Sequence, residues 1–136
     1  MKLLKLKYLT LLISIAIFPL SAFSFDHEHN KWSEILAEHV ILKDGQSYFK
    51  YKELKNNKSV LKQLNTYLDE LSAVSQEIFD KFSKDQKFSF LVNAYNAFTV
   101  KLIVDNYPVD SIKDIGSIFS SPWKKDFFKI FGKKTN

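Results

Sequence analysis

Three polar side chains, Ser89, Asn93 and Asn96, recur at intervals of four and three residues inside an otherwise apolar stretch. On a helix this spacing places them on one stripe. An asparagine amide that is buried without hydrogen-bond partners costs roughly 1 to 3 kcal/mol, so buried amides here need partners. The stripe therefore either faces a pocket, where it binds a substrate or orients a catalytic group, or forms hydrogen bonds to the turn at 44–45 or to the turn at 114–116. We favour the second interpretation.

Histidines offer two further candidates for chemistry. The run Asp26-His27-Glu28-His29 contains donors that suit a divalent metal, but His-x-His places its rings on opposite sides of an extended chain, and a terminal segment is usually mobile. We therefore expect no metal site there. His39 ends an amphipathic stretch beside Val40, which indicates a satisfied boundary histidine or a helix C-terminal charge more than a catalytic base.

The motifs of common enzymes are missing from the sequence. It has no cysteine, and therefore no thiolate metal site, cysteine nucleophile or disulfide. Three glycines are too few for a nucleotide-binding loop, and there is no His-Glu-x-x-His or Gly-x-Ser-x-Gly pattern. We expect no cofactor.

The element that must position the polar stripe is a helix from 84 to 106. Ser83 and Gln86 have the spacing of a capping box, and Pro108 stops the helix. Its apolar residues cover nearly the whole circumference, including an arc formed by Leu91, Tyr95, Phe98 and Leu102. A helix that is apolar nearly all round is typical of the centre of a domain.

Shorter elements surround this helix. We expect helices over 30–40, from 56–57 onward and after Ser75. The second of these helices has a seam of leucines at 61, 64, 68 and 71. Residues 46–51 form either a short strand or an extended edge. Ser111 can cap a short turn, and Ser121-Pro122-Trp123 predicts a last helix that buries Trp123, Phe127, Phe128 and Phe131. The predicted fold is mainly α: short helices packed around one central buried helix, with at most a minor strand.

The first 24 residues predict an N-terminal signal helix. Lysines at positions 2, 5 and 7 precede an apolar run from Tyr8 to Leu20, and Ala22-Phe23-Ser24 supplies the small residues of a cleavage site. The run has about 13 residues, fewer than the roughly 20 that span a bilayer. We expect cleavage after Ser24, no stable membrane anchor afterwards, and a single periplasmic or extracellular domain over 25–136.

Removal of this leader changes the charge balance. It takes three of the twenty basic residues and none of the fifteen acidic ones, so the net charge falls from +5 to about +2. No cluster of cations interleaved with aromatic residues remains. Nucleic acid is therefore not an expected partner.

The run 88–97, Phe-Ser-Phe-Leu-Val-Asn-Ala-Tyr-Asn-Ala, is followed by Tyr-Pro-Val-Asp-Ser-Ile-Lys-Asp-Ile-Gly over 107–116 and by Ser-Pro-Trp over 121–123. This sequence resembles the bacterial branch of the domain of unknown function numbered 547. Upstream, Trp32, the end of the first helix, Asp44-Gly45 and the segment 68–74 agree with the same family. The resemblance covers nearly all of 25–136.

The resemblance implies an enzyme-like domain without a settled activity. In the family, the point corresponding to Gly132 is followed by a helix, an Arg-containing segment, a His-Phe-Ala-Leu stretch and a Cys-Pro motif, none of which this sequence contains. The chain therefore resembles the N-terminal portion of such a domain and is expected to be truncated and inactive alone. The matching positions that could line a family site are Asn93, Tyr95 and Asn96.

Two functions remain open at the level of sequence. One is an exported enzyme-like domain that lacks its second part, such as a hydrolase acting on an envelope polymer or peptide. The alternative is a noncatalytic periplasmic binding or interaction module. In that case we expect a partner chain to cover Phe127, Phe128 and Phe131.

Overall fold

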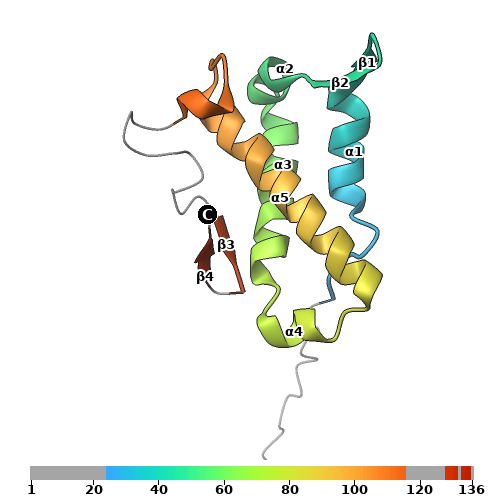
Figure 1. The fold of residues 1–136 in the computed structure, drawn as a ribbon. Coiled ribbons are helices and arrows are strands. Elements are labelled where there is room, and N and C mark those ends of the chain that lie inside the picture. The colour runs from blue at the N-terminus through green and yellow to red at the C-terminus, as the bar shows by residue number, and fades with distance from the viewer. Residues whose placement is uncertain (1–23, 116–127, 132, 136) are drawn as a thin grey trace, which may run out of the picture.

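The computed structural model describes residues 24–115, 128–131 and 133–135. Residues 1–23 of the predicted leader lie outside these ranges, and so do Phe127 and the predicted cap of the last helix at 121–123. Among the described residues the chain is mostly helical, as the sequence predicts, with two short hairpins (Figure 1). The elements in chain order are α1 (Asn30–His39), β1 (Val40–Lys43), β2 (Gln46–Phe49), α2 (Tyr51–Asn56), α3 (Lys58–Ala73), α4 (Gln76–Asp80), α5 (Lys84–Asn106), the 3-10 turn η1 (Ile112–Asp114), β3 (Phe128–Ile130) and β4 (Lys133–Thr135).

Local capping sets the starts of the longer helices. The Asn57 side chain accepts hydrogen bonds from the amides of Ser59 and Val60, and Ser75 accepts one from Ile78. The predicted capping box before α5 is present: the Ser83 hydroxyl accepts from the Gln86 amide at 3.2 Å, and the Gln86 side chain accepts from the Ser83 amide at 2.9 Å. These bonds satisfy amides that a helix start leaves without partners.

The first hairpin joins β1 and β2 in antiparallel register, with Ile41 opposite Tyr48. Its two-residue turn has positive φ at both Asp44 and Gly45, the conformation of a type I′ turn, which Asp-Gly favours. The predicted strand at 46–51 is therefore present in part, over 46–49. Residues from Tyr51 onward form α2, which the sequence analysis did not anticipate.

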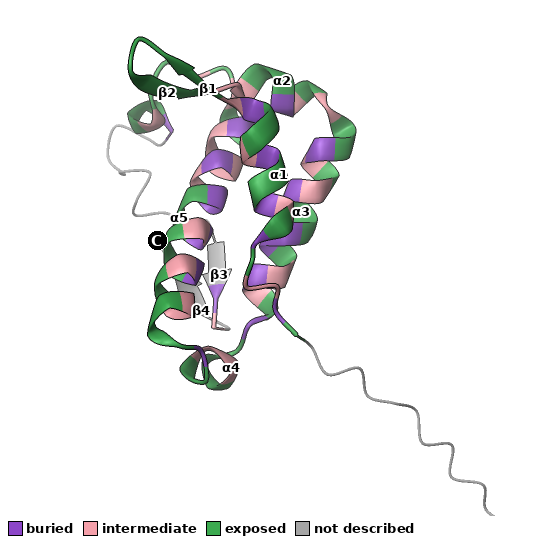
Figure 2. Cartoon of the chain, turned by 90° about the vertical axis from the view of Figure 1, so that its right-hand side faces the viewer, coloured by how far each residue is buried: buried purple, intermediate pink, exposed green. Residues whose placement is uncertain are grey.

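The centre of the fold is α3 as much as α5. α3 contacts α1, α2, α5 and β3, and α5 lies obliquely across it (Figure 1). α5 runs for 23 residues, as predicted, but it is buried on one face only. The prediction of a helix buried all round was wrong. Within the predicted apolar arc only Phe98 is buried, whereas Leu91 and Tyr95 are exposed. Figure 2 shows the exposed residues along the outer side of α5.

The predicted last helix is also corrected where the chain is described. Phe128 to Ile130 form β3, and β3 pairs antiparallel with β4. Phe128 and Ile130 alternate along an extended segment, and Phe131 at the turn has a φ of 53°. Ile130 is buried and Phe131 is half-buried, so this hairpin reaches the core. An aromatic-rich, period-two segment suits a strand better than a helix.

Candidate functional site

The predicted pocket-lining residues all lie on α5, but they do not lie at one depth. Asn93 is half-buried, whereas Tyr95 and Asn96 are exposed. Within the described residues no hydrogen bond joins either amide to the turn at 44–45 or to Asp114. Because Asn96 is exposed, its amide does not lie in the core, and the favoured prediction that the stripe binds these turns is not confirmed for the described residues. A ligand-binding role for these three residues stays a prediction.

The outer face of α5 is apolar. Phe88, Leu91, Val92 and Tyr95 follow a helical spacing and are 70%, 48%, 42% and 50% exposed. At 100° per residue they lie opposite the buried face, which consists of Phe90, Ala94, Ala97, Phe98, Val100 and Val104. We call these four exposed residues the outer face of α5. The sequence shows that the helix is apolar on nearly all sides and predicts that all of them are buried, which is wrong for this face.

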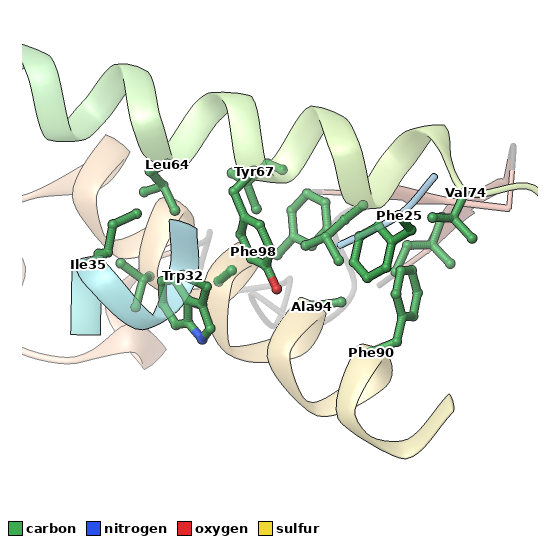
Figure 3. Close-up of a cluster of buried hydrophobic side chains, with 14 of the residues drawn as sticks. Phe25, Trp32, Ile35, Leu64, Tyr67, Val74, Phe90, Ala94 and Phe98 are labelled. Atoms are coloured by element: carbon green, nitrogen blue, oxygen red, sulfur yellow. The ribbon is translucent and has the colours of Figure 1, made fainter. Parts of the chain in front are cut away.

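A buried polar pair lies beneath the other face of α5. His29 precedes α1 with a φ of 52°, and its Nδ1 lies 2.7 Å from the hydroxyl oxygen of Tyr67 on α3. The Tyr67 ring stacks parallel on Trp32, with 6.0 Å between centroids. Figure 3 shows Tyr67 and Trp32 in the same cluster as Phe25, Phe90 and Ala94. The pair joins the segment before α1 to α3.

Burial dominates the electrostatics of this pair. It lowers the pKa of His29, an effect that the Asp26 and Glu28 carboxylates oppose and that His27 reinforces. Burial also raises the pKa of the Tyr67 hydroxyl, and the carboxylates of Asp26 and Glu70 raise it further. Both side chains are therefore held in their neutral forms near pH 7.

Asp26 organises the segment that leads into α1. Its carboxylate accepts hydrogen bonds from the amides of Asn30 at 2.9 Å and Glu28 at 3.0 Å. The bond from Asn30 lowers the pKa of this carboxyl, against a smaller opposing effect of burial. The sequence predicts that this segment is mobile. Instead Asp26 accepts a hydrogen bond from the amide of Asn30, the first residue of α1, and the segment is packed because Phe25 and His29 are buried.

A small open pocket lies next to this segment. It has a volume of about 290 Å³ and is lined by Ser24, Phe25, Asp26, Lys31 and Glu70. Lys31 Nζ lies 2.9 Å from a carboxylate oxygen of Glu70, an ion pair that raises the pKa of Lys31. The pocket therefore carries two carboxylates and one ammonium group. None of the residues predicted to line a pocket contributes to it.

The other histidines offer no catalytic arrangement. His39 is buried, its Nδ1 lies 3.3 Å from the carbonyl oxygen of Ile35, and its ring stacks on Phe49. The ring of His27 packs edge-on against Phe82. In the described part of the chain no three His, Cys, Asp or Glu side chains gather in a way that could hold a metal ion.

No protein-family model, curated protein or solved structure matches this chain. The described residues include no helix with the length and apolar character required to span a membrane. The resemblance to the family numbered 547 therefore stays a prediction. What the geometry offers is one exposed apolar helix face and one acidic pocket at the start of the fold.

Proposed function

We propose that this chain is an exported interaction module that resembles the N-terminal part of an enzyme-like domain and is inactive alone. It binds the apolar side of an amphipathic helix of another polypeptide along the outer face of α5. The observation that carries the proposal is the exposure of Phe88, Leu91, Val92 and Tyr95 on a helix whose opposite face is buried. Large apolar side chains grouped on one surface mark interaction sites more often than chance exposure does.

The size of the outer face favours a helix as the ligand. With about 150–250 Å² for each aromatic ring, the four exposed side chains present on the order of 400 Å² of apolar surface. A stable dimer of globular chains usually buries about 800 Å² on each partner. A second copy bound through this face alone would fall short of that, whereas a single amphipathic helix matches a linear stripe at i, i+3, i+4 and i+7.

The sequence analysis placed the partner surface at Phe127, Phe128 and Phe131. Phe131 packs against Phe79 and Phe90 of the same chain, with ring centroids 4.7 and 6.1 Å apart. Phe127 and the side chain of Phe128 lie outside the described part. The outer face of α5 is therefore the better-supported surface.

The resemblance also indicates one class of partner. In the family numbered 547, Arg, His and Cys motifs follow the part that residues 25–132 resemble. A polypeptide segment that carries such motifs fits the proposal.

The test is photocrosslinking in cells that export the chain. A photoreactive amino acid at Val92, on the outer face, should form an adduct with one defined polypeptide, whose crosslinked segment is mapped by mass spectrometry. Thr66, which is exposed on α3, serves as the matched control position and should give no such adduct.

The mapped segment is then synthesised as a peptide and titrated against the purified protein by calorimetry. A Phe88→Asp variant should weaken its binding by at least about tenfold, because the charge would be desolvated at the interface. Equal binding by wild type and Phe88→Asp, or equal adducts from Val92 and Thr66, would contradict the proposal.

A further inference from the structure

The residue that follows the predicted leader is part of the core. Phe25 is 7% exposed, and its ring contacts those of Phe90, Phe82 and His29, at centroid distances of 5.2, 6.0 and 5.3 Å. Ser24, one residue earlier, is exposed. The boundary between leader and domain, which the sequence pattern places after Ser24, therefore coincides with the boundary between solvent and core.

Folding restricts access to the bond between these residues. A protease binds the chain in extended form on both sides of the bond that it cuts, so Phe25 would have to leave its aromatic contacts. The four residues 21–24 that separate Leu20 from Phe25 span at most about 14 Å. That length cannot hold the folded body away from a peptidase that binds the apolar run at the membrane surface.

The pocket beside this boundary carries a net negative charge. The Asp26 and Glu70 carboxylates outnumber the single Lys31 ammonium group that shares the pocket. Ser24 and Phe25 line the same pocket, so an N-terminal nitrogen at Phe25 would lie close to these carboxylates. A cation at this nitrogen would balance the charge of the pocket.

We propose that the Ser24–Phe25 bond is a processing site that is hydrolysed before the domain folds, and that the N-terminal ammonium group created at Phe25 then occupies the acidic pocket formed with Asp26 and Glu70. In this hydrolysis water adds to the Ser24 carbonyl carbon and the C–N bond breaks. Ser24 keeps the new carboxylate on the leader, and the Phe25 nitrogen takes up protons to become the ammonium group. The inference rests on the predicted leader and is independent of the outer face of α5.

The order of processing and folding is tested on the full chain, 1–136, with a purified leader peptidase. Precursor diluted freshly from urea should be cut after Ser24, and refolded precursor should be cut at least about tenfold more slowly, because Phe25 must first undock. Phe25→Ala should remove most of this protection. Leu42→Ala, at a position in the first hairpin that is 81% exposed, is the matched control and should retain the protection.

Cleavage of refolded wild-type precursor as fast as of unfolded precursor would overturn the proposed order, as would a first residue other than Phe25 in the processed product. The ammonium site is tested by a separate experiment. That experiment can contradict the proposal even if the Phe25→Ala variant fails to fold. Protein that begins at Phe25 and protein that begins at Ser24 are compared by NMR titration of the α-amino group.

The α-amino pKa is expected above its ordinary value of about 7.7 in the chain that begins at Phe25, and closer to that value in the chain that begins at Ser24. Glu70→Gln should lower the raised pKa. Lys31→Gln, which breaks the same ion pair but keeps the carboxylate, should not lower it. The same pKa in all four proteins would overturn the ammonium site.

Discussion

At the scale of single residues, the burial of His29 makes the stability of the fold depend on pH. Burial lowers its pKa in the folded protein below the value of about 6.5 expected in the unfolded chain. The unfolded chain therefore binds the proton more readily. The resulting stability is complete above pH 6.5 and decreases as the pH falls from 6.5 through the lowered pKa of the folded state.

We expect the free energy of unfolding, measured with urea, to fall between pH 7.5 and pH 5 in the wild type and to fall less in His29→Asn. Asparagine tolerates the positive φ at this position and does not titrate. Asp26 also has a lowered pKa, but its contribution is lost only below its unfolded value of about 3.8, outside this range. Parallel pH profiles of the two proteins would contradict the assignment.

Tyr67 is the other half of the pair. We expect Tyr67→Phe to destabilise the fold by about 1 to 2 kcal/mol, because the buried Nδ1 of His29 loses its hydrogen-bond partner while the ring stays in place. Tyr48→Phe is the matched control: the Tyr48 hydroxyl bonds to Gln46 at the surface, and its loss should change stability by less than about 0.5 kcal/mol. Urea denaturation measures both, and similar losses would show that the buried pair is not special.

At the scale of elements, the start of α5 depends on one side chain. We expect Ser83→Ala to cost about 1 kcal/mol of stability, because it removes the capping bond to the Gln86 amide. Ser59→Ala, at an exposed position in the first turn of α3 where Asn57 provides the cap, should cost less than about 0.5 kcal/mol. Equal midpoints in urea for the two variants would argue against the box as a stabilising unit.

Local signals explain what the sequence could predict. The caps at Asn57, Ser75 and Ser83 and the bounds of α5 depend on residues within a few positions of one another, and the structure confirms them. The second hairpin and the burial of Phe25 depend on contacts with α3 to α5, far away in the sequence. For the same reason the apolar pattern of α5 could not reveal that one face stays exposed.

At the scale of the whole molecule, a cluster of phenylalanine rings unites distant parts of the chain. Fully buried Phe90 contacts Phe25, Phe79, Phe82 and Phe131, which come from the segment before α1, from α4 and the turn after it, and from the second hairpin. Aromatic burial of this kind is the main source of stability that a domain without disulfides can use.

We expect Phe90→Ala to destabilise the protein by about 3 to 5 kcal/mol, because it leaves a cavity among four rings. Phe88→Ala, two residues earlier on the same helix and 70% exposed, should change stability by less than about 0.5 kcal/mol. Thermal and urea denaturation of both variants provide the comparison. A large loss in Phe88→Ala would mean that the outer face of α5 is covered within the chain itself.

The parallel stacking of Trp32 on Tyr67 allows the packing of α1 on α3 to be followed by optical spectroscopy. An indole that is 2% exposed should emit at shorter wavelength than one in water, and its fixed orientation against a phenol ring should produce a near-ultraviolet circular dichroism band. In a Trp123→Phe background, Trp32 becomes the single indole of the chain. Its spectrum then reports, without any added dye, when the first helix separates from the third.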